Sequence, residues 1–198
     1  MPSITDISQL DLDKTYSYAD YLTWTFQDRL ELLKGKVFKM SPAPGRTHQK
    51  IVGRLHIQLA KNFARGKCQL YLSPFDVRLL NRKKSTPDKD VYTVVQPDLC
   101  VICDEDKLEE RGCNGAPDLV IEILSPGNSK KELGIKFDLY EEAGVQEYWI
   151  VEPAEKTVFI YCLIDGKYSG QRPLTEDDMM KSPLFPQLDF GIADIFEA

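Results

Sequence analysis

The stretch PDLVIEILS at positions 117–125 decides the fold that this sequence predicts. Its run of Val, Ile and Leu is typical of a buried β-strand, yet Glu122 stands in the middle of it. A second Pro-Asp pair, Pro97-Asp98, lies within another strand-like run at 92–103. A buried carboxylate without a partner takes up a proton or binds a cation. Two acids inside a sheet therefore indicate a cationic partner, and a divalent metal is one candidate.

Around these strands, the pattern of apolar residues predicts further helices and strands. We expect a short helix over 18–26, a hairpin over 30–40 turning at Lys34-Gly35, helices over 47–64 and 130–143, a loop over 81–90, and strands over 70–80, 119–124, 146–151 and 157–164. The helix between strands 119–124 and 146–151 is long enough to return the chain in parallel. The sequence thus predicts an α/β (α+β) fold with a mixed sheet, helices packed on it, and an apolar tail at 184–196 docked on the body.

The length of 198 residues suits a single domain over 1–198. No basic, apolar leader opens the sequence, and no apolar run approaches the roughly 20 residues that span a bilayer. We therefore expect a cytoplasmic protein without a membrane partner. The five cysteines, at positions 68, 100, 103, 113 and 162, are expected to be free thiols. Cys100 and Cys103 have CxxC spacing, but residues three apart on a strand point to opposite faces, which disfavours zinc or redox chemistry.

Charge is distributed unevenly along the chain. The net charge is −6, but positions 45–84 hold ten Lys and Arg against one acid, Asp76. On the expected 47–64 helix and just beyond it, four basic residues fall on one side, and we call them the basic ridge: Lys50, Arg54, Lys61 and Arg65. The ridge is either a solvated helix face or a surface that contacts phosphates. His48, near the start of the same helix, is a candidate phosphate contact, a helix cap or a hydrogen-bond partner.

Asp98 and Glu122 suggest a specific chemistry if their strands pair. Alternate residues of a strand share a face, so the two carboxylates can then offer oxygen ligands to one hard cation, Mg²⁺ or Mn²⁺. Such an ion polarises a phosphoryl oxygen and lowers the pKa of a bound water. A nearby lysine would stabilise the developing negative charge or help to activate the water. This combination predicts phosphodiester hydrolysis.

An ordered series of motifs accompanies these two acids, which 23 residues separate. The series consists of ELLKG at 31–35, MSP at 40–42, His48, QPD at 96–98, PDLVIEILSP at 117–126, Lys136 with Tyr140, and GVQEYW at 144–149. It resembles the Uma-type family of predicted bacterial endonucleases, within the PD-(D/E)xK superfamily. The resemblance implies a restriction-endonuclease-like fold with an N-terminal hairpin extension, Mg²⁺ or Mn²⁺ as cofactor, and DNA as substrate.

The resemblance also implies roles for particular residues. Asp98, Glu122 and Glu31 match the acids that hold the metal. The superfamily lysine is expected two residues after Glu122, where this chain has Leu124, so the resemblance assigns the catalytic lysine to Lys136 in the following helix. Lys130 and Lys131 are alternatives. Each assignment also has a structural alternative: Asp98 could start a strand, Glu122 could sit in a plain salt bridge, and Lys136 could be solvated.

Three hypotheses follow. The first is a Mg²⁺-dependent endonuclease acting on DNA, working as a homodimer because two strands are cut. The second is a catalytically inactive nuclease-fold module that binds nucleic acid or a protein partner, which Leu124 favours. The third is a structural or partner-binding protein with an acidic surface, which would have no salt-dependent affinity for DNA.

Overall fold

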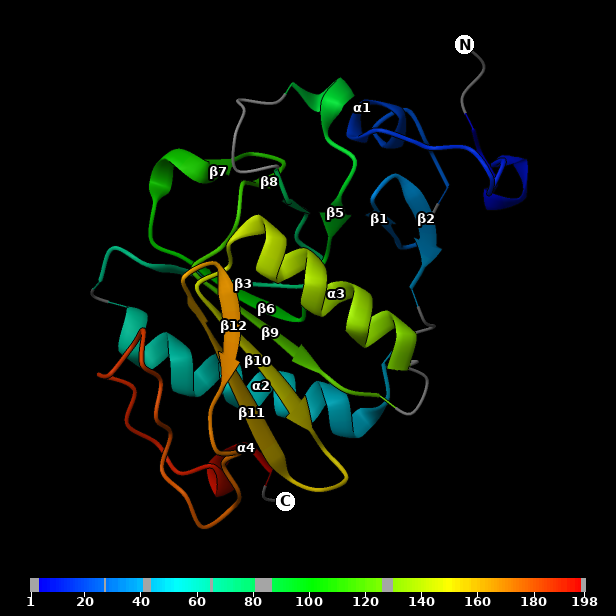
Figure 1. The fold of residues 1–198 in the computed structure, drawn as a ribbon. Helices are drawn as coiled ribbons and strands as arrows, with labels where there is room; N and C mark the ends of the chain where they lie inside the picture. Colours follow the sequence, from blue (N-terminus) through cyan, green and yellow to red (C-terminus); the bar gives the residue numbers. More distant parts are fainter. Residues whose placement is uncertain are drawn as a thin grey trace.

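The computed structural model describes residues 4–26, 28–40, 44–64, 66–80, 87–125 and 130–196, and the side chains of 130–132 lie outside this description. Within these residues the chain forms two six-stranded mixed sheets with helices packed on them (Figure 1). The α+β fold class expected from the sequence is confirmed. None of the helices in the described part is both long and apolar enough to cross a membrane.

One of the two sheets, the one with the longer strands, contains the strand that carries Glu122. Its order is β12 (Lys167–Gly170), β11 (Thr157–Ile164), β10 (Glu147–Glu152), β9 (Leu119–Ile123), β6 (Leu99–Ile102) and β3 (Gln69–Leu72). β9 and β10 run parallel, whereas every other pair of neighbours in this sheet is antiparallel. Helix α3 (Lys130–Ala143) joins the parallel pair, with the bounds that the sequence predicts.

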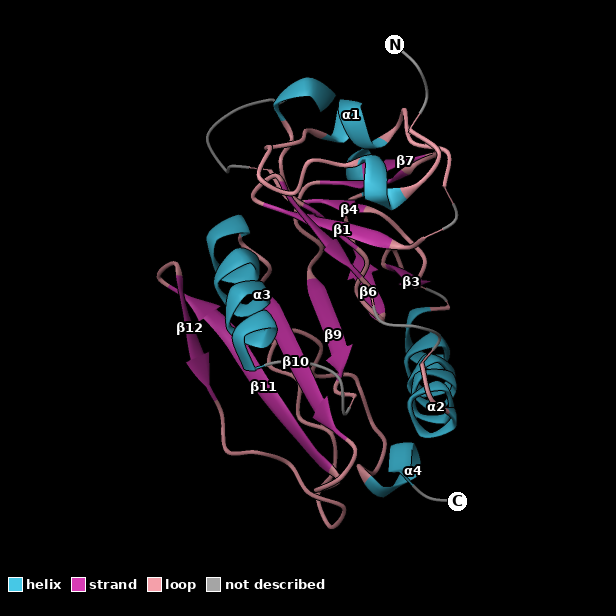
Figure 2. Cartoon of the chain, turned by 90° about the vertical axis from the view of Figure 1, so that its right-hand side faces the viewer, coloured by secondary structure: helices cyan, strands magenta, loops and turns pink. Residues whose placement is uncertain are grey.

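Two long helices cover opposite faces of this sheet (Figure 2). Helix α2 (Arg46–Phe63) follows the fourfold spacing of its apolar residues and buries Ile51, Leu55, Leu59 and Phe63 against one face, which Leu119, Ile121 and Ile123 line. Helix α3 packs on the other face, where Val120 and Tyr148 meet Leu139 and Tyr140. Because side chains alternate along β9, Glu122 falls on the α3 face.

The N-terminal hairpin belongs to a second sheet. Its order is β2 (Lys36–Lys39), β1 (Leu30–Leu33), β5 (Val94–Val95), β4 (Val77–Arg78), β8 (Gly112–Asn114) and β7 (Leu108–Glu109). The predicted turn is present: Lys34 and Gly35 both have positive φ, 50° and 79°, as a two-residue hairpin turn requires. The hairpin is therefore not a free extension, since β1 also pairs with β5.

Two strands expected as single elements each divide between the two sheets. The 70–80 segment becomes β3 and β4, and the 92–103 segment becomes β5 and β6. Pro74 and Pro97 lie at the two breaks, and a proline has no N–H to continue a ladder of hydrogen bonds. The chain thus passes from one sheet to the other within each segment, and Asp98 lies at the second of these crossings, between β5 and β6.

Three smaller expectations have mixed outcomes. The 18–26 helix is limited to α1 (Tyr18–Tyr21), capped by Ser17. The tail docks as predicted, burying Phe185, Leu188 and Ile195 against the α2 side of the core, and it ends in α4 (Ala193–Phe196). Of the 81–90 loop, residues 81–86 lie outside the described residues, and Asp88–Asp90 form a 3₁₀ turn.

The expectation of five free thiols is wrong for two cysteines. Cys68 and Cys103 form a disulfide, whereas Cys100, Cys113 and Cys162 are free. The cause lies in the strand register: β3 and β6 are antiparallel with Gln69 opposite Ile102, so the residues that flank this pair also face each other. Sequence spacing alone does not reveal that register.

Candidate functional site

Asp98 and Glu122 lie side by side on neighbouring strands. β6 and β9 are antiparallel with Leu99 opposite Ile121, which brings Asp98 opposite Glu122. The backbone N–H of Ile123 donates to Asp98 Oδ2 at 2.8 Å, fixing the carboxylate at the end of the strand. The strand pairing that the metal hypothesis requires is thus present.

Lys136 points from α3 into the protein and meets two of the predicted acids. Its Nζ donates to Glu122 Oε1 and to Glu31 Oε1, each at 3.0 Å. All three side chains are buried, with Lys136 only 7% exposed. The alternative of a solvated lysine is therefore wrong. Lys130 and Lys131 cannot be compared with it, because their side chains lie outside the described residues.

Glu31 reaches this group from the other sheet. It lies on β1, is 2% exposed, and its Oε1 also accepts the backbone N–H of Gln96 at 2.9 Å. Gln96 in turn links two further polar side chains: its Oε1 accepts from Arg29 Nη2 at 3.0 Å, and its Nε2 donates to Asp76 Oδ1 at 2.8 Å. In the sequence, only its place in the QPD motif at 96–98 marks Gln96. We call Glu31, Asp98, Glu122 and Lys136 the carboxylate cluster.

Two more side chains hold the acids in place. The Tyr140 hydroxyl, one helical turn after Lys136, donates to Glu122 Oε1 at 2.7 Å. His48 Nε2 lies 3.1 Å from Asp98 Oδ2. His48 is 9% exposed, so its bond to Asp98 makes it a hydrogen-bond partner of a site acid, one of the roles that the sequence left open.

The basic ridge lies away from the carboxylate cluster. Lys61 is exposed, whereas Lys50 and Arg54 are half-buried and the Nη1 atom of Arg54 is buried. Helix α2 covers the face of the sheet opposite to Glu122. Arg65 lies outside the described residues. The predicted ridge and the predicted metal acids therefore lie at two separate places. Of the residues that the structure describes, only His48, in the first turn of α2, connects this helix with the acids.

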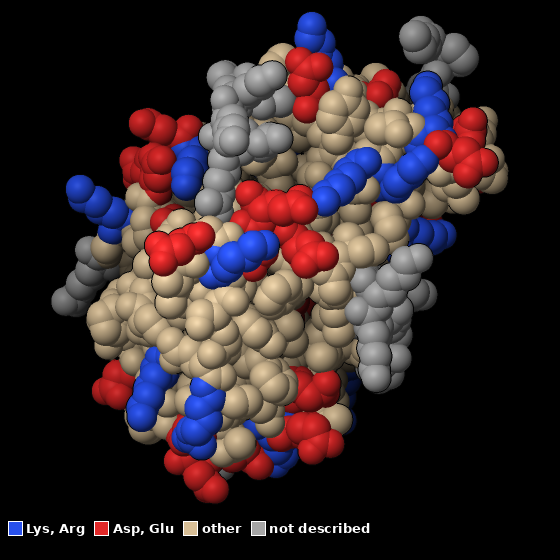
Figure 3. All heavy atoms as spheres, in the orientation of Figure 1, with Lys and Arg blue, Asp and Glu red and all other residues tan. Residues whose placement is uncertain are grey.

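Surface ion pairs fasten α3, which carries Lys136, to strands on both sides. Lys34, in the β1–β2 turn, pairs with Glu142 at 2.9 Å, and Lys167, on β12, pairs with Glu141 at 2.7 Å. Figure 3 shows acidic and basic side chains intermixed over this part of the surface. Exposed pairs contribute little stability, so burial of the helix does most to position Lys136.

Burial and charge set the protonation of the cluster. Burial raises the pKa of Glu122 to about 7, and the attraction of Lys136 opposes that rise while the negative charges of Asp98 and Glu31 add to it. Burial opposes the charged form of Lys136, yet the two carboxylates outweigh it and raise the lysine pKa. For His48, burial is likewise outweighed by the hydrogen bond and charge of Asp98, and its pKa rises.

The raised pKa of Glu122 predicts a pH-dependent stability. Relative to the ordinary value of 4.5, a folded-state pKa near 7 favours the protonated form, so this contribution to stability is complete below pH 4.5 and is lost as the pH rises through 7. Urea unfolding at a series of pH values should show Glu122→Gln gaining up to about 3 kcal/mol relative to the unmodified protein across this window. A stability difference that does not change with pH would contradict the prediction.

The donor chemistry of the cluster fits Mg²⁺ or Mn²⁺. Two carboxylates, Glu31 and Glu122, contact the Lys136 ammonium, and Asp98 lies opposite Glu122. Glu31 Oε2, Asp98 Oδ1 and Glu122 Oε2 take part in no hydrogen bond among the described residues. Hard cations prefer such oxygen ligands. Among the described residues, however, no three Asp, Glu, His or Cys side chains are arranged around a common position for an ion.

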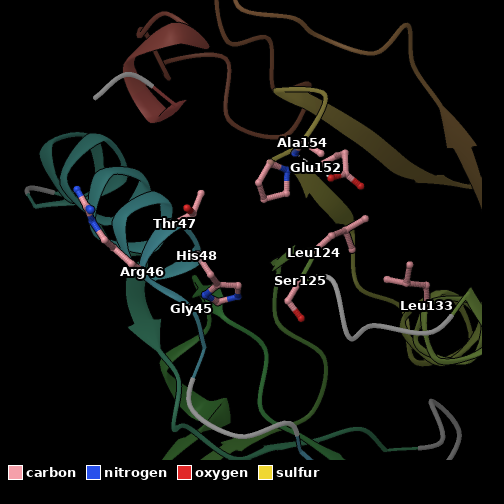
Figure 4. A pocket seen from close by; sticks show the side chains of 10 residues that line it. Gly45, Arg46, Thr47, His48, Leu124, Ser125, Leu133, Glu152 and Ala154 are labelled. Atoms are coloured by element: carbon pink, nitrogen blue, oxygen red, sulfur yellow. Dashed lines mark hydrogen bonds between the residues drawn. The ribbon is translucent and has the colours of Figure 1, made fainter.

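A pocket of about 780 Å³ adjoins the cluster (Figure 4). We call it the β9–β10 pocket, and its lining consists of Gly45, Arg46, Thr47, His48, Leu124, Ser125, Leu133, Glu152, Pro153 and Ala154. His48 belongs to both features, since its ring lines the pocket and its Nε2 contacts Asp98. Leu124, at the position where the superfamily has its lysine, forms part of the wall.

Comparison with known proteins identifies the family. The model of the family described as "Uma2: Putative restriction endonuclease" matches residues 18–193. The chain belongs to the Uma2 family. The resemblance seen in the sequence motifs is thus confirmed. Another similar sequence is the uncharacterised protein slr1290 of Synechocystis, 26% identical over 145 residues, which are 72% of this chain and 71% of that protein.

A solved structure shares the fold of this Uma2 protein. It is the crystal structure of "a putative nuclease belonging to DUF820" from Anabaena variabilis, with a TM-score of 0.70 and 22% sequence identity. The match covers 91% of this chain and 97% of the other. At this level of identity the likeness concerns the fold alone.

Proposed function

We propose that this Uma2 protein is a Mg²⁺- or Mn²⁺-dependent endonuclease that hydrolyses phosphodiester bonds of DNA. The observation that carries the proposal is the position of Lys136, whose Nζ lies 3.0 Å from both Glu31 and Glu122. A lysine beside paired carboxylates is the combination that metal-assisted phosphate chemistry uses. Membership of the family described as "Uma2: Putative restriction endonuclease" supports the same class of reaction.

Each residue of the cluster has a distinct part in this proposal. Asp98, Glu122 and Glu31 present the oxygens that hold the ion, which when bound polarises a phosphoryl oxygen and lowers the pKa of a water. Lys136 stabilises the negative charge that develops on the phosphate. Tyr140 and His48 orient Glu122 and Asp98 through their hydrogen bonds. Burial of the cluster strengthens all of these interactions, because the local dielectric constant is low.

DNA extends beyond the site, and the basic ridge supplies a second contact in this proposal. Lys50, Arg54 and Lys61 would bind phosphates along the duplex, while Arg46 and His48 lie where α2 begins beside the pocket. Residues 1–198 act as one domain, and two copies form a homodimer that cuts both strands.

The test is metal-dependent cleavage of supercoiled plasmid DNA by variants that keep the shape of the acids. Asp98→Asn and Glu122→Gln should each lower the cleavage rate by about a thousandfold, as loss of a key electrostatic group does in other enzymes. Asp118→Asn is the matched control: Asp118 directly precedes β9, but its Oδ2 accepts the N–H of Cys103 at 2.8 Å and has no contact with Lys136 among the described residues. Undiminished cleavage by both site variants would refute the proposal.

Leu124 favours a second candidate, a nuclease-fold module that binds nucleic acid or a protein partner without cutting. Calorimetric titration with Mn²⁺ separates the two candidates, because it does not depend on finding the right DNA. The endonuclease should bind the ion and lose that affinity in Glu122→Gln. A folded protein that binds DNA but shows no metal affinity would be the inactive module.

A further inference from the structure

The β9–β10 pocket lies at the edge of the sheet where ligands commonly bind. β9 and β10 run parallel, so both strands leave the sheet at the same edge, and the residues that follow them line the pocket: Leu124 and Ser125 after β9, and Pro153 and Ala154 after β10. Crevices outside the carboxyl ends of parallel strands are the usual ligand sites of open α/β sheets. The volume of about 780 Å³ falls in the range of small-molecule sites.

The walls of this pocket have two characters. Leu124, Leu133 and Pro153 form an apolar surface, while Glu152 and His48 lie on opposite sides of the pocket (Figure 4). The side chain of Arg46 points away from the pocket, so Arg46 lines it near the main chain. A matching ligand has a flat or apolar body with a polar group at each end.

The His48 side of the pocket suits an anion. Helix α2 begins there, and its N-cap residue, Gly45, provides no side-chain hydrogen bond. The first N–H groups of a helix have no acceptor within the helix, and the helix dipole adds positive potential. A separate observation is that His48 is 91% buried, and its Nδ1 has no hydrogen-bond partner among the described residues while Nε2 is bonded to Asp98. His48 therefore places a buried polar atom in the wall of the pocket, next to the first turn of α2.

We propose that the β9–β10 pocket receives one unstacked nucleotide of the DNA strand, with its phosphate at the first turn of α2 and its base between Leu124, Leu133 and Pro153. This assignment rests on the proposed endonuclease function and names where the substrate strand enters. His48 connects the two regions, so the phosphate in the pocket is a near neighbour of the one that is cut. Enzymes that act on DNA can extrude a nucleotide into a pocket in this way.

Glu152 gives the pocket a preference among bases. Its Oε1 accepts the N–H of Ala154 at 3.0 Å, and its other oxygen has no hydrogen bond among the described residues. A carboxylate accepts from an exocyclic amino group, as found on cytosine, adenine and guanine but not on thymine. The pocket should therefore favour the three amino-bearing bases.

The experiment measures binding of the four deoxynucleoside 5′-monophosphates by protein NMR in the presence of EDTA, so that no cleavage is involved. We expect dCMP, dAMP and dGMP to bind about tenfold more tightly than dTMP, and Glu152→Gln to remove that difference. Leu124→Trp, which fills the pocket, should weaken binding by at least about tenfold. Leu12→Trp makes the same exchange at an exposed position and should leave binding unchanged.

The outcomes separate this proposal from the endonuclease itself. If Leu124→Trp does not fold, Leu133→Trp fills the same pocket from α3 and replaces it. Binding that is absent for every mononucleotide, or unchanged in the folded pocket-filling variant, overturns the pocket assignment while metal-dependent cleavage stands. Conversely, nucleotide binding that Leu124→Trp abolishes, in a protein without metal-dependent cleavage, supports the pocket and refutes only the endonuclease.

Discussion

Replacing Lys136 by methionine is expected to abolish DNA cleavage and to destabilise the fold at the same time. The substitution keeps the length of the side chain but leaves Glu31 and Glu122 buried without their cation. Breaking a buried ion pair by removing one partner costs about 3–5 kcal/mol, and the loss of one charge-stabilising group lowers a rate by about 10²–10³-fold. Urea unfolding and plasmid cleavage measure the two effects separately.

A double variant distinguishes the two effects. In Lys136→Met with Glu122→Gln, one of the stranded carboxylates is replaced by a neutral amide, so part of the lost stability should return while cleavage stays absent. Lys34→Met is the matched control, because Lys34 pairs with Glu142 on the surface, with more than half of each side chain exposed. A Lys136→Met protein that cleaves DNA at the normal rate would remove Lys136 from the proposed chemistry.

Replacing Glu147 by alanine is expected to loosen the C-terminal tail from the core. Glu147 is fully buried on β10, and its carboxylate accepts from Trp149 Nε1 at 2.6 Å, Ser182 Oγ at 2.7 Å and the N–H of Leu184 at 2.9 Å. Alanine would leave these donors buried without an acceptor, at about 1–3 kcal/mol each, so the free energy of unfolding should fall by at least about 3 kcal/mol. Hydrogen exchange should accelerate over residues 182–196.

Two comparisons test the reason for this loss. Glu147→Gln keeps one acceptor oxygen and should lie between the unmodified protein and Glu147→Ala in stability. Glu155→Ala removes an exposed acid from the β10–β11 turn and should change stability by less than about 0.5 kcal/mol. If Glu147→Ala lowers the free energy of unfolding but does not accelerate hydrogen exchange over residues 182–196, the carboxylate does not anchor that segment.

Local patterns predicted most of the secondary structure. The fourfold spacing of apolar residues sets α2, and the turn residues Lys34-Gly35 set the first hairpin, because both signals act over a few neighbouring residues. The two breaks at Pro74 and Pro97 were missed as boundaries between sheets. Each short strand pairs with a partner far along the chain, and proline marks the break without indicating which sheet follows.

The candidate site was predicted unevenly for the same reason. Asp98 and Glu122 could be singled out from the motif spacing and the alternation of strand faces, but only the structure shows that their strands pair. Glu31 and Lys136 came from family resemblance, and the bond between them joins residues 105 positions apart. The contact of His48 with Asp98 and the anchoring role of Glu147 depend on packing between distant elements, which no local pattern encodes.

The amino-acid sequence alone determined the long helices, most of the strands, the parallel return of the chain from β9 to β10, and the presence of two acids in strands that cannot hold unpaired charges. These features depend on periodicity, turn chemistry and the cost of burying a carboxylate, all of which can be read from neighbouring residues. Only the tertiary structure decided that Lys136 lies between Glu31 and Glu122, that the basic ridge faces away from them, and that a pocket opens beside His48. Those are consequences of how two sheets and two helices pack together, and packing brings together residues that the sequence keeps far apart.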